Sequence, residues 1–552
     1  MRDGVAAVAA VLLIGLVLIV PNHPLAATWG ALRVFPLELP AIVIALALVR
    51  GAALRALRAF VAVWLVAMTA LKLADFATHT AFDRSFNPAL DLHLGVAAWR
   101  MLSGAVGWPL ALTWALGLAA GLALLARALW WATGRVARLA PSMARGPALA
   151  LVPVGALTLA AADVAREVSP ANPPGAAFTA RLTWEHGREI VRARVGLAAF
   201  RLEATRDDMA ALPPRAILPA LAGTDVLLIF VESYGRATLE QPIHAPRITA
   251  TLTEIEARLA QAGLAMRSGY LTAPMVGGQS WLAHASVLSG LTIDTQARYR
   301  ALLASPRRTL LHLAQSAGWR TVAVMPAITL AWPEAGYFGY DRVLAAADLG
   351  YEGAPFNWVT MPDQFTLAAF ERAELAARDR PPVMAEIALI SSHAPWTPIP
   401  PLLPWGELGD GRVFDRHATA GEAPEDLWRD LDRVREQFGL AIDYSLRTVG
   451  AFAERRAASA PLIVVLGDHQ PASFVSLDAD GRDVPIHVIG SPEALALIAG
   501  WGWTPGLVPA PDAPAWPMGE FRDRFLDAFS TANPAWCDRG ATAGPLPIAD
   551  RC

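Results

Sequence analysis

Long apolar segments are concentrated in the first third of this chain, and they constrain its fold more than any other feature. Crossing a bilayer takes roughly 20 mostly apolar residues. The second segment is short and contains Pro40. The first has the character of a signal peptide, but we favour an uncleaved helix because further apolar segments follow it. Together they predict a membrane region at residues 1–166 with five transmembrane helices. We expect these helices at about residues 4–21, 36–50, 58–75, 107–130 and 147–165.

Arginines in the loops between these segments set the expected orientation. Positively charged loops stay on the cytoplasmic side of a membrane. The loops after the second and fourth segments carry more arginine than the alternate loops, which places the N-terminus in the cytoplasm and everything beyond about residue 166 outside. We therefore expect a multi-pass protein of a bacterial cytoplasmic membrane. The arginine-rich loops hold Arg50, Arg55, Arg58, Arg127, Arg135, Arg138 and Arg145, and the alternate loops hold Arg33, Arg84 and Arg100.

The rest of the chain reads as a linker followed by a soluble domain. Residues 167–222 mix helix-like stretches with prolines, so we expect a helical linker along the membrane surface. In residues 223–552, apolar strands such as "TDVLLIFVES" alternate with helical runs such as "APRITATLTEIEARLAQAG". This alternation predicts an α/β domain with a mostly parallel sheet, whose site lies at the carboxyl ends of the strands. A net charge of -3 without a basic, aromatic cluster argues against a nucleic-acid partner.

Two side chains with chemical potential stand near predicted strand ends in the first half of this domain. Glu232 directly follows a buried apolar run, where it either caps a turn or points outward as a metal ligand. Ser280 follows Gly277 and Gly278 at a predicted helix start. It is either an ordinary N-cap or a nucleophile at the positive end of a helix dipole.

The second half of the domain adds a histidine and an Asp-His pair. His393, in "SSHAPWTPIP", is either an exposed loop residue or a group that binds substrate oxygens and acts as a general acid. Asp468 and His469 end the strand "PLIVVLGD", and a carboxylate beside an imidazole suits Zn²⁺ or Mn²⁺. A parallel sheet would bring all of these strand ends onto one edge, which favours the chemical interpretation of each.

In this order, "VLLIFVES", Gly-Gly-x-Ser, "SSHAPW" and "VVLGDHQP" resemble the sulfatase-like branch of the alkaline phosphatase superfamily. The resemblance is closest to membrane enzymes of the lipoteichoic acid synthase and phosphoglycerol transferase type. It implies an α/β/α catalytic domain and one divalent metal ion, Mn²⁺ or Zn²⁺. It further implies metal ligation by Glu232, Ser280, Asp468 and His469, a covalent intermediate on Ser280 in place of the usual threonine, and substrate binding by His393, Trp358 and Asp363.

The family's formylglycine signature, C/S-x-P-x-R, is absent, because "SWLAH" begins at the candidate serine. We therefore expect a membrane-anchored phosphotransferase that moves a phosphoglycerol-type group from a lipid donor to an acceptor hydroxyl, such as that of an envelope glycan. Two alternatives stay open: transfer to water, by a phosphodiesterase, phosphatase or sulfuric ester hydrolase, and a non-catalytic membrane scaffold. His487, in "DVPIHVIG", is expected to be a buried structural histidine.

The chain has two cysteines, Cys537 and Cys552, both in the last stretch of the sequence. Their spacing fits no Cys/His zinc motif. If this part faces an oxidising compartment they are able to form a disulfide. The alternative is a pair of free thiols.

Overall fold

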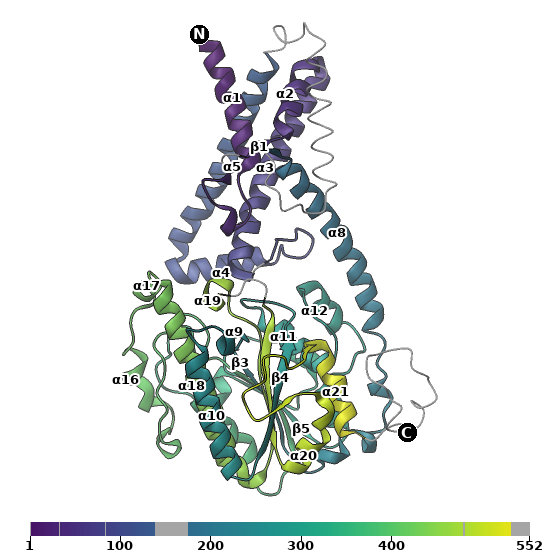
Figure 1. Ribbon diagram of the computed structural model, residues 1–552, viewed down its shortest axis with the longest axis vertical. Coiled ribbons are helices and arrows are strands. Elements are labelled where there is room, and N and C mark those ends of the chain that lie inside the picture. Colours follow the sequence, from purple (N-terminus) through teal and green to yellow (C-terminus); the bar gives the residue numbers. More distant parts are fainter. Residues whose placement is uncertain (1, 32–33, 83, 139–174, 478–480, 531–552) are drawn as a thin grey trace. The chain divides into compact units, whose positions relative to one another are not determined.

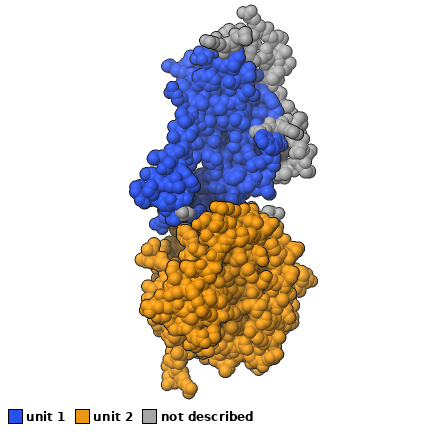
Figure 2. All heavy atoms as spheres, turned by 90° about the vertical axis from the view of Figure 1, so that its left-hand side faces the viewer, with its two compact units in different colours: residues 1–198 blue, residues 199–552 orange. Residues whose placement is uncertain are grey.

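The computed structural model describes residues 2–31, 34–82, 84–138, 175–477 and 481–530. The chain divides into two compact units, residues 1–198 and 199–552, which Figure 2 colours separately. The division falls inside helix α8 (Phe178–Glu203) and within the stretch expected to be a linker. Cys537 and Cys552 lie outside the described residues.

The first unit is built from helices (Figure 1). Four of them share a core of small and branched side chains that includes Ala10, Ile14, Leu65 and Leu129. A short parallel strand pair, β1 with β2, joins a segment near the start of the chain to the segment that precedes α8. The elements are α1 (Arg2–Ile19), β1 (Phe35–Pro36), α2 (Glu38–Leu48), α3 (Gly51–Phe82), α4 (Leu94–Val106), α5 (Trp108–Ala137) and β2 (Gly175–Ala176).

Two described helices, α3 and α5, are long and apolar enough to cross a membrane. The prediction of five spans is therefore wrong for the part of the chain that the structure describes, and the span expected at 147–165 lies outside it. Helix α2 is only 11 residues long, because the residues before it are used in β1. The apolar stretch of α1 ends at Ile19, since Pro21 disfavours helical backbone at the residue before it.

The second unit contains a nine-stranded sheet in the order β10-β4-β9-β8-β3-β7-β5-β6, with β11 beside β4. The strands β8, β3, β7, β5 and β6 run parallel. Most strand pairings in the sheet are parallel, as expected, but β9 pairs antiparallel with both β8 and β4, so the sheet is mixed. The strands are β3 (Val226–Val231), β4 (Ala265–Thr272), β5 (Arg320–Met325), β6 (Arg342–Ala345), β7 (Val383–Leu389), β8 (Leu462–Gly467), β9 (Asp483–Gly490), β10 (Thr504–Pro505) and β11 (Ala515–Pro517).

Helices cover both faces of this sheet, which gives the expected α/β/α layering (Figure 1). Alternate residues of β3 show why its sequence lacks polar positions: Leu227 and Ile229 face one core, and Leu228 and Phe230 face the other. Helices α10 (Ala245–Gln261), α15 (Asp363–Phe370) and α18 (Leu431–Arg456) pack on the first face, and α11 (Ser280–Ser289), α13 (Leu310–Ser316), α20 (Pro492–Leu497) and α21 (Phe521–Phe529) on the second.

Candidate metal centre

Glu232, Asp468 and His469 meet at one edge of the sheet. One ligand atom from each lies within 4.8 Å of the others, and no other group of three or more His, Cys, Asp or Glu residues in the described part of the chain does so. The sheet register explains the meeting. Val231 of β3 lies beside Gly467 of β8, so the next residue of each strand emerges at the same place. The expected convergence of these strand ends is observed.

The two glycines flanking these ligands let the strand-end loops approach closely. A Cβ at Gly467 would lie 1.9 Å from the carbonyl oxygen of Tyr234, and a Cβ at Gly235 would lie 1.7 Å from Oε1 of Gln470. The turn after β3 and the turn after β8 are thus packed backbone to backbone. This explains the glycine directly before Asp468 and the glycine three residues after Glu232.

Backbone hydrogen bonds then aim the ligand atoms. Oδ1 of Asp468 accepts from the backbone N–H of Ser233 at 2.8 Å and from that of His469 at 2.7 Å. Nδ1 of His469 donates to the Gln470 carbonyl at 2.8 Å. This turns Nε2 toward Oε1 of Glu232, 3.3 Å away. Outer contacts of this kind fix the tautomer and orientation of metal-binding histidines.

The electrostatics of the cluster favour a bound cation. Burial raises the pKa of Asp468, and the Glu232 carboxylate raises it further. Burial opposes the charged form of His469, but the carboxylates of Asp468 and Glu232 outweigh it and raise the pKa of His469 to about 9. Burial also opposes ionisation of Glu232, yet the hydrogen bond and charge of His469 hold its pKa low. The cluster therefore demands positive charge, which a divalent cation supplies while displacing the proton.

Ser280 completes the donor set. It is the first residue of α11, and its Oγ donates to Oε2 of Glu232 at 3.1 Å and lies 3.3 Å from Nε2 of His469. The N-cap position belongs to Gln279, so the interpretation of Ser280 as an ordinary N-cap is wrong. Two carboxylates, one imidazole and one hydroxyl match the nitrogen and oxygen ligands of four-coordinate zinc and also suit manganese. The residues present therefore fit the single metal ion that the resemblance implies.

The loop after β7 brings His393 close to this cluster. The hydroxyl of Ser392 donates to the backbone carbonyl of Glu232 at 2.6 Å, which ties the loop to the end of β3. His393 itself is exposed, and its Nδ1 donates to the Ala394 carbonyl at 2.6 Å. Its Nε2 therefore remains available to a substrate.

Asp363 was expected to bind substrate, but its side chain is not accessible from the surface, so it does not contact a substrate in this structure. The side chain is fully buried. Its Oδ1 accepts from the backbone N–H groups of Ile390 at 2.8 Å and Ser391 at 2.9 Å, and its Oδ2 accepts from the hydroxyl of Ser445 at 2.7 Å. Asp363 instead holds the loop that carries His393. Trp358 is 61% exposed, which leaves its ring free to contact another molecule.

His487 is a buried structural histidine, as expected. Its Nδ1 lies 2.8 Å from Oγ of Ser268, and its Nε2 lies 3.0 Å from the hydroxyl of Tyr234. Burial lowers the pKa of His487 to about 3, so it stays neutral. The ring contacts the Tyr234 side chain and is not among the candidate metal ligands.

The sequence analysis missed a polar network next to Ser280. Nδ1 of His284 donates to Oε1 of Glu386 at 2.6 Å, and the hydroxyl of Tyr340 donates to the other carboxylate oxygen. A sequence signal was present, since Glu386 is the only charged residue inside the apolar strand β7. No spacing rule linked that strand to a histidine 102 residues away.

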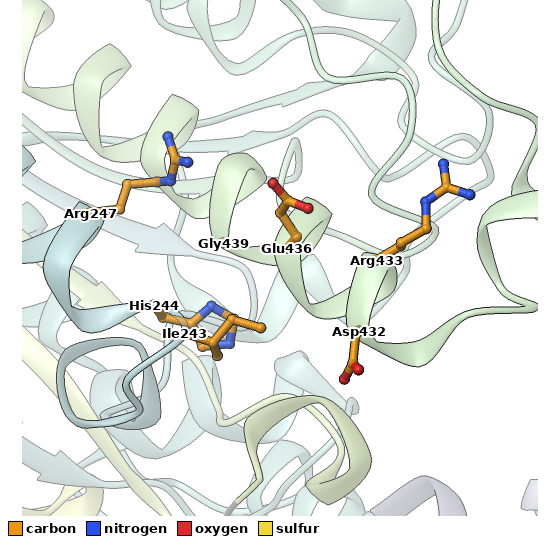
Figure 3. Close-up of a pocket in the computed structure, with 7 residues that line it drawn as sticks. All are labelled: Ile243, His244, Arg247, Asp432, Arg433, Glu436 and Gly439. Carbon is orange, nitrogen blue, oxygen red and sulfur yellow. The ribbon is translucent and has the colours of Figure 1, made fainter.

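A pocket of about 320 Å³ lies elsewhere on this unit, between the first turns of α10 and α18 (Figure 3). None of its lining residues belongs to the cluster described above. Its charged side chains carry both signs and are exposed, and Arg433 forms an ion pair with Glu422. The pocket therefore lacks the converging ligand atoms of the strand-end cluster. Its lining residues are Ile243, His244, Arg247, Asp432, Arg433, Glu436 and Gly439.

Comparison with known proteins finds similar solved structures, although no family model and no curated protein matches the chain. One is the lipoteichoic acid synthase LtaP from Listeria monocytogenes, with 16% identity and a TM-score of 0.35, over 50% of this chain and 66% of that chain. The C-terminal periplasmic domain of EptC from Escherichia coli matches with 14% identity and a TM-score of 0.36, over 56% of this chain and 82% of that one.

A third is the Streptococcus pyogenes phosphoglycerol transferase GacH in complex with sn-glycerol-1-phosphate. It has 13% identity and a TM-score of 0.36, over 60% of this chain and 90% of that chain. These matches include the kinds of enzyme that the sequence motifs resemble. At such TM-scores the likeness carries no argument about activity, substrate or metal, which depend on the residues of this chain itself.

Proposed function

We propose that this protein is a membrane-anchored, metal-dependent phosphotransferase that uses Ser280 as its nucleophile. The observation that carries the proposal is the position of Ser280 Oγ, which lies 3.1 Å from Glu232 and 3.3 Å from His469. A hydroxyl needs a lowered pKa to attack phosphorus, and a hydroxyl in a cluster of cation ligands at a helix start obtains it. A divalent ion held by Glu232, Asp468 and His469 would supply Lewis-acid polarisation, which lowers the pKa of the Ser280 hydroxyl.

The residues of the chain then divide the reaction into two steps. The deprotonated Oγ of Ser280 attacks a phosphodiester, the bond from phosphorus to the leaving alcohol breaks, and a covalent phosphoserine diester forms. Nε2 of His393 faces the leaving oxygen and donates a proton to it. In the second step an acceptor hydroxyl gives its proton to His393 and attacks phosphorus, and Ser280 leaves with the electron pair of its bond.

A lipid-linked donor carrying a phosphoglycerol-type group suits a protein with two helices able to cross a membrane, because enzyme and donor then share one surface. We place the membrane region at residues 1–166, a surface linker at 167–222 and the extracytoplasmic catalytic domain at 223–552. An acceptor on the envelope glycan would be reached from the same side. Mn²⁺ and Zn²⁺ are the ions that the donor set suits.

Transfer to water is the second candidate function. It is favoured by the exposure of His393, which leaves the activating group open to solvent. The two functions differ in the ratio of the rates at which the donor is consumed with and without an acceptor alcohol. If a lipid-linked donor is consumed equally fast with and without an acceptor alcohol, the protein is a hydrolase. If the acceptor accelerates consumption and captures the group, it is a transferase.

The proposal is tested by trapping the intermediate on the full chain in detergent. After a rapid acid quench with a nitrophenyl phosphodiester, we expect a covalent adduct on the peptide that contains Ser280, and none in Ser280→Ala. Ser289→Ala is the matched control, since Ser289 lies at the far end of α11 and its buried hydroxyl has no hydrogen-bond partner in the structure. Absence of the adduct from the metal-loaded parent and the control contradicts the proposed function.

A further inference from the structure

The helix that carries Ser280 begins in backbone that offers little support. α11 is ten residues long, and its N-cap residue makes no side-chain capping bond. The residues just before it all have positive φ angles, 75° at Gly277, 142° at Gly278 and 66° at Gln279. Glycine has no Cβ to restrict such a turn. The backbone N–H of Gly277 donates to the Gln470 carbonyl at 2.9 Å, which ties the start of this loop to the strand-end cluster. The rotation of α11 itself is set by contacts of the helix.

His284 provides such a contact one helical turn after Ser280. Residues four apart lie on the same face of a helix. Nδ1 of His284 donates to Oε1 of Glu386 at 2.6 Å. The His284 ring also stacks on Phe230, with 3.8 Å between ring centroids and 14° between planes. Phe230 is on β3, two residues before Glu232, so His284 connects the helix of the nucleophile to the strand of a candidate metal ligand.

Glu386 is fixed in turn by the sheet and by Tyr340. It belongs to β7, where it lies beside Leu228 of β3, and it is 1% exposed. Its second oxygen accepts from the hydroxyl of Tyr340, which lies just before β6. The network thus connects α11 with the parallel part of the sheet from which Glu232 emerges.

This polar network fixes the orientation of α11 rather than adding to the stability of the fold. A buried, paired charge is commonly no more stabilising than well-packed apolar residues of the same size. Near Ser280 the buried contacts of α11, such as Leu282, are apolar and non-directional. Its other buried hydrogen bonds to neighbouring segments lie toward the far end, where Ser286 Oγ accepts from the backbone N–H of Ile293 at 2.9 Å and the Ser289 carbonyl accepts from Arg307 at 2.8 Å. The hydrogen bond from His284 is the directional contact one turn from Ser280, so it fixes the rotation of this end of the helix. A displacement of 1 Å at a reacting group lowers a rate by about 100-fold.

We propose that His284, held by Glu386 and Tyr340, is the positioning residue that keeps Ser280 Oγ against Glu232 and His469. The inference rests on the proposed function of Ser280 and adds a residue that acts through it. His284 does not touch the substrate in this proposal. It sets the rate at which Ser280 is phosphorylated in the metal-loaded protein without changing how tightly the substrate binds.

The test compares His284→Leu with His284→Gln in the full chain. The leucine fills the space but cannot bond to Glu386, whereas the glutamine amide is able to donate to it. We expect His284→Leu to slow formation of the Ser280 adduct by about 100-fold at saturating metal, with KM unchanged. We expect His284→Gln to recover most of the rate. A purely structural role would not separate the two variants in this way.

Tyr340→Phe keeps the ring and removes one donor from Glu386, so it serves where His284→Leu fails to fold. We expect a smaller loss of adduct rate, about 3- to 10-fold, the effect of one lost hydrogen bond of about 1 kcal/mol. A wild-type adduct rate in either His284→Leu or Tyr340→Phe overturns the inference. Equal losses in His284→Leu and His284→Gln also overturn it. If instead the parent protein forms no adduct, the proposed function itself is at fault, so the two failures are distinguishable.

Discussion

The carbonyl oxygen of Tyr234 lies where a side chain on Gly467 would begin. A Cβ there would be 1.9 Å from that oxygen, far inside van der Waals contact. The turn that follows Glu232 and the turn that carries Asp468 are therefore one packed unit, although 235 residues separate Ser233 from Asp468. Their mutual fit brings the candidate ligands together before any metal binds.

Gly467→Ala is expected to break this unit. The added methyl meets backbone on a strand buried on both faces, so the strand or the Tyr234 turn has to move. We expect a loss of about 1–3 kcal/mol in the free energy of unfolding, together with loss of bound metal. Thermal unfolding and metal analysis of the purified protein measure both. Gly500→Ala is the control, because a Cβ there meets no atom within 4 Å. Normal metal content in Gly467→Ala would show that the close approach is dispensable.

Asp363→Ala and His393→Gln are expected to act on the same loop in different ways. Removing the Asp363 carboxylate leaves the N–H groups of Ile390 and Ser391 buried without partners, at about 1–3 kcal/mol each. Asp363→Ala should therefore lower the melting temperature and the activity together. His393→Gln should lower activity alone, since His393 is exposed. The opposite pattern, a stable Asp363→Ala and a destabilised His393→Gln, contradicts the assigned roles.

The sequence predicts the strands that are uninterrupted apolar runs, but it does not predict a strand that mixes polar and apolar residues. β3 and β8 are uninterrupted apolar runs, so their ends, and with them Glu232 and Asp468, were identified correctly. β4 was missed, because "AMRSGYLT" mixes polar and apolar residues and is specified by its antiparallel pairing with β9. That pairing is also what makes the sheet mixed. Contacts set by the tertiary fold rather than by local pattern escape a reading of one sequence.

In the candidate site, too, some residues could be predicted from local sequence and others could not. Glu232, Asp468 and His469 directly follow strands, so the rule that sites lie at carboxyl strand ends found them. Asp363 was expected to bind substrate only because of the family resemblance, and its side chain is instead buried against the loop that it holds. Burial of a polar side chain depends on which segments pack over it. The loop at Ile390 and Ser391 and the helix at Ser445 pack over Asp363, and the sequence next to Asp363 does not predict these contacts.

Lys72, the only lysine in the chain, is expected to be irreplaceable in α3. Its buried ammonium donates to Thr179 Oγ1 at 2.9 Å and to the carbonyls of Val17 at 3.1 Å and Leu18 at 3.0 Å, near the end of α1. An ammonium has three donors around one point, whereas guanidinium is a planar fork. We expect Lys72→Arg to lower the melting temperature in detergent, by a loss of about 1–3 kcal/mol.

Arg55→Lys is the control for this substitution, because Arg55 lies on the same helix but is exposed. It should leave the melting temperature unchanged. If Lys72→Arg melts with the parent protein, the fit of the three acceptors to an ammonium is not what stabilises this part of the first unit.

His244 is expected to make stability depend on pH. Burial, together with the nearby charge of Arg435, lowers the pKa of His244 from 6.5 to about 4. The unfolded chain therefore binds a proton near pH 6.5 that the folded chain accepts only near pH 4. This contribution to stability is fully present above pH 6.5 and is lost as the pH falls toward 4, by about 3 kcal/mol at most.

His244→Gln removes the titrating group, and the adjoining pocket leaves room for the amide (Figure 3). The fall in melting temperature between pH 6.5 and pH 4 should be smaller in His244→Gln than in the parent protein. Identical pH profiles for the two proteins would show that the pKa of His244 is the same in the folded and the unfolded chain.

The most direct test of the central claim is anomalous diffraction from crystals of the full chain soaked with Zn²⁺. If Glu232, Asp468, His469 and Ser280 share one cation, a single strong peak will lie among their donor atoms, about 2.0–2.2 Å from the oxygen and nitrogen ligands. A peak at another site, or none here at saturating zinc, would contradict the metal-dependent chemistry proposed for Ser280.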